Sequence, residues 1–227
     1  MNEKPVLNVK SLKEQVYDFL REQMRRGEIL PGSVIDLEET SQKLGVSRTP
    51  LRDALLQLES EEFVTILPRR KVVVNVLEDK DIKNYYEIIG ALESVAILKA
   101  FEVLSNREID YMEKMNQEMS EAIKADNFDL YYEKNLNFHN VYLNACGNEK
   151  LMSIVNNLKK RLYDFPRPKG FVKEWEEASI GEHARLIDYL RHGQKEEAAK
   201  FIRDIHWSYE VQKKYIVKYY QHLTEPA

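Results

Sequence analysis

Three of the five histidines in this sequence could bind one metal ion together: His139, His183 and His206. Asn135 precedes His139 by four residues, so both side chains would lie on one face of a helix and could share an ion. Imidazole nitrogen binds zinc, nickel, cobalt, manganese or iron comparably, and an amide oxygen can complete such a site. Taken alone, each histidine is more often a hydrogen-bonded core or surface residue, so the spacing leaves both interpretations open.

A pair of arginines could read DNA. In the stretch LGVSRTPLRDALLQLESEEFV, residues 44–64, Arg48 and Arg52 lie four residues apart and would share one helix face. Their guanidinium groups could reach a guanine edge or a phosphate, and the hydroxyls of Ser47 and Thr49 could contact phosphates at a helix N-terminus. The formal net charge of -4 does not indicate a nucleic-acid binder. A local basic surface is nevertheless sufficient.

A winged helix-turn-helix would position these arginines. The apolar spacing predicts a helix over residues 11–26 and a short helix over 36–44 that Gly45 terminates. Ser47 is a suitable N-cap for the next helix, and Pro50 is tolerated in its first turn. Two β-rich runs, FVTIL and KVVVNV, then predict a hairpin. Its tip carries three cations that could contact a DNA backbone or minor groove: Arg69, Arg70 and Lys71.

The remainder of the sequence has helical periodicity, with breaks that separate about six helices. We therefore expect a mainly α fold, with a winged helix-turn-helix DNA-binding domain over residues 1–77 and an all-helical domain over 78–227. The scarcity of glycine and proline, 8 and 7 residues, agrees with long helices. No apolar run is long enough to cross a membrane, and no signal peptide is evident. The single cysteine, Cys146, suits a reducing cytoplasm.

The N-terminal region resembles the winged helix-turn-helix of the GntR family of bacterial transcription regulators. The similarity runs from LKEQVYDFLREQMRRGEILPG through LGVSRTPLRDALLQLESEEFV to VVV. It implies that Arg48, Thr49 and Arg52 contact DNA and that the tip of the wing contacts a groove. The sequence departs from the family at three positions. Glu38 stands where an arginine is usual, and Glu62 and Lys71 stand where glycines are usual.

The helical region resembles the FCD-type ligand-binding domain of the FadR-like branch, from LEDKDIKNYYEIIGALESVA to HWSY. Many such domains hold a metal with an aspartate and three histidines. NLNFHNVYLNACGN matches the pattern DxxFHxxLxxxxGN, which implies that His139 is a ligand, and EHARLIDYL implies the same for His183. Asn135 replaces the usual aspartate. The last histidine usually follows about 22 residues after the one in EH, where Ile205 stands, and His206 is one residue later. One residue turns a helix by about 100°. Either the preceding loop absorbs this offset or His206 faces elsewhere.

The resemblance implies a ligand-responsive transcription regulator. We expect a homodimer that binds a pseudo-palindromic operator in double-stranded DNA, with its affinity set by a small organic carboxylate bound at zinc, nickel or manganese. Arg161 could bind a second carboxylate of this effector, or could belong to an exposed basic helix end. Ile89 stands where relatives often carry an arginine, so an effector contact made there would be absent.

Two alternatives remain. The helical domain could bind an acyl-thioester in an apolar pocket without any metal, as in FadR-like sensors. It could instead be a zinc-dependent hydrolase or hydratase, because three histidines can leave an open position that activates water. The sequence has no nucleophile elbow and no HExxH motif, and an enzyme would leave the DNA-reading head unexplained. We therefore expect a regulator and not an enzyme.

Overall fold

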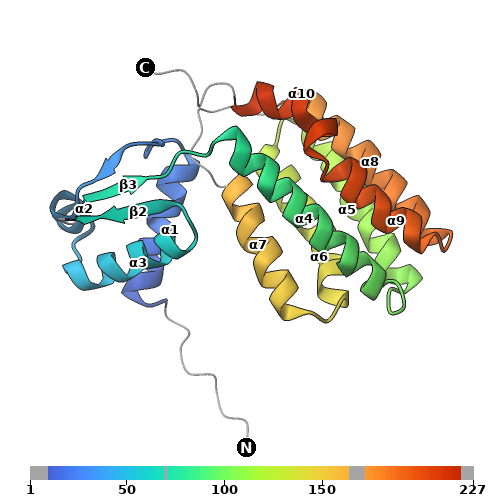
Figure 1. Ribbon diagram of the computed structural model, residues 1–227, viewed down its shortest axis with the longest axis horizontal. Helices are drawn as coiled ribbons and strands as arrows, with labels where there is room; N and C mark the ends of the chain where they lie inside the picture. The colour runs from blue at the N-terminus through green and yellow to red at the C-terminus, as the bar shows by residue number, and fades with distance from the viewer. Residues whose placement is uncertain (1–9, 69–70, 164–171, 221–227) are drawn as a thin grey trace, which may run out of the picture. The chain divides into compact units, whose positions relative to one another are not determined.

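The computed structural model describes residues 10–68, 71–163 and 172–220 (Figure 1). These residues form two compact units. One comprises residues up to 77 together with 160–163, and the other comprises 78–159 and the residues from 172 onwards. The first is a winged helix-turn-helix and the second is an all-helical bundle, so the predicted fold class is confirmed.

Up to residue 77, the described part of the N-terminal unit forms three helices and a three-stranded antiparallel sheet of order β1-β3-β2. Gly45 ends the short second helix in a left-handed conformation, with φ of 64°. The predicted hairpin is β2 and β3, paired from Val64 with Val74 to Leu67 with Lys71. A two-residue strand, which the sequence did not predict, adds to the other edge of β3. The elements are α1 (Leu12–Arg25), β1 (Val34–Ile35), α2 (Leu37–Leu44), α3 (Arg48–Ser60), β2 (Val64–Leu67) and β3 (Lys71–Val74).

One apolar face of α3 packs into the core of this unit. Its four predicted core residues are all buried, against α1 and the sheet: Leu51, Ala54, Leu55 and Leu58. Burying one large apolar side chain stabilises a fold by about 1.5–3 kcal/mol, which fixes the rotation of α3 about its own axis. The opposite face of α3 is therefore directed to solvent.

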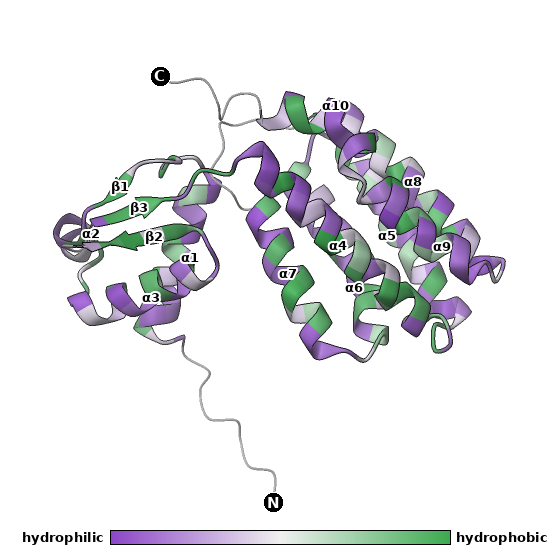
Figure 2. Ribbon diagram, viewed as in Figure 1, coloured by the Kyte–Doolittle hydropathy of each residue, from purple (hydrophilic) through white to green (hydrophobic). Residues whose placement is uncertain are grey.

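The second unit is a bundle of amphipathic helices whose hydrophobic and hydrophilic residues alternate along the chain (Figure 2). Helix α5 packs against α6 and α8, and α4 packs against α6 and α9. No helix in the described part of the chain combines the length and the apolar character needed to cross a membrane. The elements are α4 (Asp79–Ala100), α5 (Asn106–Lys124), α6 (Phe128–Ala145), α7 (Glu149–Tyr163), α8 (Lys173–Arg191), α9 (Lys195–Phe201), a π turn (Ile202–His206) and α10 (Tyr209–Tyr220).

The sequence predicted about six helices in this unit, and the last of them is divided into α9, the π turn and α10. Sequence periodicity continues from residue 195 to the C-terminal region, but the backbone changes at Ile202 into the π turn, and regular helix is interrupted at Trp207 and Ser208 before α10 begins. The backbone amide of Trp207 donates to the carbonyl oxygen of Ile202 at 2.9 Å, across five residues instead of four. This irregularity lies beside the histidines described next.

Candidate metal centre and DNA-binding surface

Three histidines from separate elements meet inside the bundle. His139 lies on α6, His183 on α8 and His206 at the end of the π turn, and one possible ligand atom from each lies within 4.8 Å of the others. The centroid of the His206 ring lies 5.0 Å from that of His139 and 5.0 Å from that of His183. The centroids of the His139 and His183 rings are 5.2 Å apart. The offset of one residue before His206 is absorbed within the helix, by the π turn, and not by the preceding loop.

Several polar atoms of the predicted ligands are buried without a hydrogen-bond partner in the described structure. They are Nε2 of His139, both ring nitrogens of His183 and Oδ1 of Asn135. A buried polar atom left unpaired costs about 1–3 kcal/mol, so these four atoms need an explanation. Burial and the nearby Lys159 ammonium lower the pKa of His139 to about 3, and burial lowers that of His183 well below its ordinary value. Both imidazoles are therefore neutral at pH 7, and their lone pairs fit a divalent ion.

The buried carboxylate of Glu93, on α4, orients His139. Nδ1 of His139 lies 3.0 Å from Oε2 of Glu93, which also accepts hydrogen bonds from the Trp207 indole at 2.8 Å and from the Tyr142 hydroxyl. Lys159, on α7, forms an ion pair with Glu93. Burial alone would raise the pKa of Glu93, but the charge of Lys159 and the contact with His139 hold it well below its usual range. The anionic Glu93 therefore favours a proton on Nδ1 of His139, which leaves Nε2 free to bind a metal.

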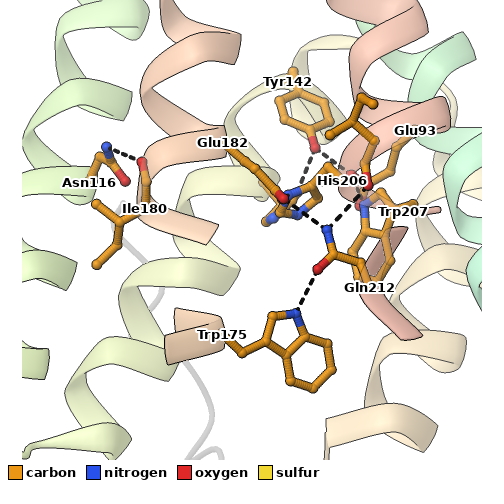
Figure 3. Close-up of polar contacts among 11 residues, drawn as sticks. Glu93, Asn116, Tyr142, Trp175, Ile180, Glu182, His206, Trp207 and Gln212 are labelled. Carbon is orange, nitrogen blue, oxygen red and sulfur yellow. Dashed lines mark hydrogen bonds and ion pairs between the residues drawn. The ribbon is translucent and has the colours of Figure 1, made fainter. Parts of the chain in front are cut away.

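A second carboxylate orients His206 (Figure 3). Nδ1 of His206 lies 2.7 Å from Oε2 of Glu182. The amide of Gln212 donates to Oε1 of the same carboxylate at 2.8 Å, and the indole of Trp175 donates to Gln212 at 3.0 Å. Residues from α8, the π turn and α10 are thereby joined behind one imidazole. Carboxylates that fix the ring of a ligating histidine in this way raise metal affinity.

Sequence reasoning missed the residues behind the histidines. Glu93 had one detectable signal, because it is a charged residue on the otherwise apolar face of IIGALESVAI. Glu182 directly precedes His183, and Trp207 directly follows His206, but adjacency alone assigns no contact. Lys159 would belong to the exposed basic helix end that was one of the two interpretations of Arg161, and it is buried.

Arg161, the predicted effector-binding residue, lies in the last turn of α7 and is only 4% exposed, so it is not part of an exposed basic end either. It groups with the N-terminal unit, where its guanidinium carbon lies 4.9 Å from the centre of the Phe63 ring. Its contact with an effector stays a prediction. Ile89, where relatives often carry arginine, is a fully buried apolar residue of α4.

The predicted DNA-contacting residues lie on the solvent-exposed side of the N-terminal half of α3. Ser47 caps the helix without a side-chain hydrogen bond, and Arg48, Thr49 and Arg52 are exposed. Arg48 forms an ion pair with Glu38 of α2, whereas the Arg52 guanidinium has no ion pair or hydrogen bond within the described residues. A helix N-terminus with such donors can bind phosphate and base edges.

The wing is described in part. Lys71 is exposed at the start of β3, while Arg69 and Arg70 lie outside the described residues. Glu62, at a position where glycine was expected, has a left-handed backbone with φ of 63°. The side-chain amide of Asn75 donates a hydrogen bond to the backbone carbonyl oxygen of Glu62 at 2.6 Å, and this bond stabilises the left-handed conformation.

Comparison with known proteins identifies both units. The family described as bacterial regulatory proteins, gntR family, matches residues 12–74, and the FCD domain matches residues 84–206, more than half of the chain. The chain is 24% identical over 190 residues to the HTH-type transcriptional regulator YdhC of Bacillus subtilis, covering 83% of this chain and 84% of YdhC. It is 25% identical over 146 residues to the HTH-type transcriptional repressor RspR of Escherichia coli, covering 64% of each chain.

Among solved structures, Escherichia coli McbR/YncC has the same fold, with a TM-score of 0.69 and 22% identity over 94% of this chain and 99% of that one. The two matched families account for the helix-turn-helix and for the bundle with its histidines. The chain therefore belongs to the GntR family of bacterial regulatory proteins, with an FCD domain after its helix-turn-helix, and is a DNA-binding transcription regulator and not an enzyme.

Proposed function

We propose that this regulator changes its operator affinity when a small organic carboxylate binds at a divalent metal ion in the FCD domain. The observation that carries the proposal is the convergence of three histidines in which Nε2 of His139 and both ring nitrogens of His183 are buried without a hydrogen-bond partner in the described structure. His139, His183 and His206 would hold the ion, and Asn135 would offer its amide oxygen. When bound, the ion supplies a positive charge that neutral ligands do not cancel, and this charge attracts a carboxylate.

The donor set bears on the identity of the metal. Three imidazole nitrogens suit zinc and nickel, whereas manganese prefers a larger share of carboxylate oxygens. The neutral amide of Asn135, in place of an aspartate, removes the one anionic ligand that would favour manganese. Among the three metals expected from sequence, zinc and nickel therefore have the stronger support.

We further propose that the protein acts as a homodimer whose two heads bind the half-sites of a pseudo-palindromic operator. Support comes from apolar side chains on the exposed side of α4, where Ile88 and Val95 lie two helical turns apart. The repressor RspR supports a repressing role, and the cytoplasm is the compartment in which such a regulator meets its operator. Sedimentation of the wild type beside an Ile88→Glu, Val95→Glu double variant tests dimerisation, and equal mass for both would contradict this interface.

The effector must bind the free protein and the DNA-bound protein with different affinities, because only a difference of this kind shifts operator affinity. Titration of candidate carboxylates into metal-loaded and metal-free protein, with and without operator, measures that difference. Equal affinity in the presence and absence of operator would mean that the bound carboxylate has no regulatory effect.

The deciding experiment is the metal content of the purified chain, measured by plasma mass spectrometry. We expect about one ion per chain in the wild type and almost none in His139→Ala, because that variant removes one of three converging nitrogens. His192→Ala is the matched control, since His192 lies on the same bundle with its side chain 64% exposed. Wild-type protein that stays free of metal after refilling with zinc, nickel and manganese would overturn the proposal and direct the search to acyl-thioesters.

A further inference from the structure

The π turn before His206 contains one residue more than a turn of α-helix. Its hydrogen bond from the Trp207 amide to the Ile202 carbonyl spans five residues, so every residue after Ile202 is rotated relative to a continuous α-helix. One residue corresponds to about 100° of rotation. The side chain just before the histidine shows the consequence, because Ile205 is 36% exposed while His206 is only 9% exposed.

Helix α4 offers the surface on which this turn rests. A methyl group added at Gly90 would lie 3.0 Å from Cβ of Trp207 and 3.4 Å from the carbonyl oxygen of Arg203. The backbone of the turn therefore lies directly against α4 at a position where any larger side chain would collide with it.

Trp207 contacts the same face of α4. Its ring packs edge-on against the ring of Tyr86, with 5.2 Å between the ring centroids, and its indole nitrogen donates a hydrogen bond to Oε2 of Glu93 at 2.8 Å. Tyr86, Gly90 and Glu93 follow one another at spacings of four and three residues, which places them on one side of the helix. Glu93 also contacts His139. The same carboxylate therefore orients the ring of His139 and holds Trp207, the residue next to His206.

We infer that the π turn, seated on Gly90, is the device that positions His206 as a metal ligand. The inference rests on the metal site proposed above. A π turn interrupts regular helical hydrogen bonding and persists only where its surroundings favour it. Here the surroundings are the contacts of His206 with Glu182 and of Trp207 with α4. A regular helix of the same length would place Ile205 where His206 now lies and would turn His206 away from the other two histidines by about 100°.

The test compares deletion of Arg203 with Arg203→Ala. The Arg203 side chain is 51% exposed and pairs with the adjacent Asp204, so the substitution keeps the length of the turn and removes only a surface interaction. We expect both variants to bind zinc with wild-type affinity, because the deletion converts the π turn into a regular turn and leaves His206 at the spacing that is usual in the family. Competition with a coloured chelator measures the affinity of the full chain. The visible spectrum of the cobalt-loaded protein shows whether the ligands are the same in all three proteins.

Combination with His206→Ala makes the test specific. If the deletion leaves His206 in place, then adding His206→Ala to it weakens zinc binding as much as His206→Ala does alone. A deletion variant in which His206→Ala causes no further loss would overturn the inference. So would a deletion variant that binds zinc about 100-fold more weakly than the wild type, as for a lost ligand.

A pair of glycine substitutions keeps the chain length fixed, in case the deletion variant does not fold. Gly90→Ala should push the turn away from α4 and weaken zinc binding by about 10-fold. Gly181→Ala is its control, because a methyl group at this position on α8 meets no atom within 4 Å. Equal zinc affinity for both variants would overturn the inference. A wild type that takes up no zinc would instead overturn the proposed metal site itself.

Discussion

The proposed DNA-binding surface and the candidate metal centre of this protein are assembled in opposite ways. Ser47, Arg48, Thr49 and Arg52 lie within six consecutive residues and are exposed at one end of α3. The three histidines come from three elements, and carboxylates from α4 and α8 orient two of them, His139 and His206. Changes to the exposed residues should therefore alter binding with little effect on stability, whereas changes to the buried cluster should alter both together.

The largest expected effect is on stability and lies in the buried cluster. Glu93→Ala would leave the ammonium of Lys159 buried without its counter-charge, which should lower the free energy of unfolding by about 3–5 kcal/mol. Urea unfolding of the metal-free protein, followed by the fluorescence of its two tryptophans, measures the change. Both tryptophans, Trp175 and Trp207, lie in the bundle, so this signal reports on that unit.

A charge-balanced variant separates the ion pair from the packing around it. Glu93→Gln combined with Lys159→Met removes both charges and keeps similar volumes, so it should recover most of the stability lost in Glu93→Ala. If the double variant were as unstable as Glu93→Ala, the loss would come from the hydrogen bonds to Trp207 and Tyr142 and not from the unpaired ammonium.

Metal addition should have the next largest effect. Zinc at 100 times its dissociation constant should stabilise the bundle by about 2.7 kcal/mol, because the native state alone has the three converging nitrogens. The same unfolding measurement, with zinc and with a chelator, tests this expectation. His139→Ala should show no stabilisation, and a stabilisation equal to that of the wild type would place the bound zinc elsewhere on the chain.

Arg52→Ala is the matching change on the exposed surface. If Arg52 reads a guanine edge, its loss should weaken operator binding by about 1–3 kcal/mol and relax the base preference at one position. The unfolding free energy should change by no more than about 0.5 kcal/mol, as for other exposed positions. Operators selected from a random DNA library by the purified protein provide the assay, and Arg185→Ala on α8 is a control. An equal loss on all sequences would instead identify a phosphate contact.

Glu62→Gly should stabilise the N-terminal unit by about 0.4–1 kcal/mol. Glycine adopts the left-handed conformation at this position, φ of 63°, without the steric cost that glutamate has there. Thermal unfolding followed by circular dichroism measures the gain, with Glu59→Gly inside α3 as a control that should destabilise. A loss of stability in Glu62→Gly would mean that the glutamate makes contacts worth more than the strain.

The smallest effect is expected at Glu38, which forms an exposed ion pair with Arg48. Glu38→Gln should tighten binding to any DNA by less than about 1 kcal/mol, because it frees the Arg48 guanidinium and removes a charge that repels phosphates. Affinities for operator and for random DNA at several salt concentrations measure this. A gain confined to one operator sequence would show that Glu38 takes part in base recognition.

The sequence predicted the exposed surface almost completely and the buried centre in part. The turn at Gly45, the cap at Ser47 and the apolar face of α3 are local signals, and they determine where Arg48 and Arg52 lie. The convergence of His139 and His183 was inferred from a resemblance. The contacts of Glu93 and Lys159 depend on how α4, α6 and α7 pack, and no local pattern encodes that packing.

The position of His206 shows why spacing alone was insufficient. Counting residues along a regular helix placed Ile205 where a ligand was expected, since sequence periodicity assumes one number of residues per turn. The π turn changes that number over five residues, and the close approach to Gly90 that accommodates it comes from tertiary packing.

The π turn also has an evolutionary consequence. A residue added within a regular helix normally rotates everything that follows, but a residue added in a π turn is confined to that turn, which here lies between Phe201 and Trp207. When this chain is aligned with relatives one residue shorter in this region, the gap belongs inside this helix and not in the loop at Gly193. An alignment that opens the gap in that loop would shift the whole of α9 by one residue and pair its buried face with the exposed face of its homologues.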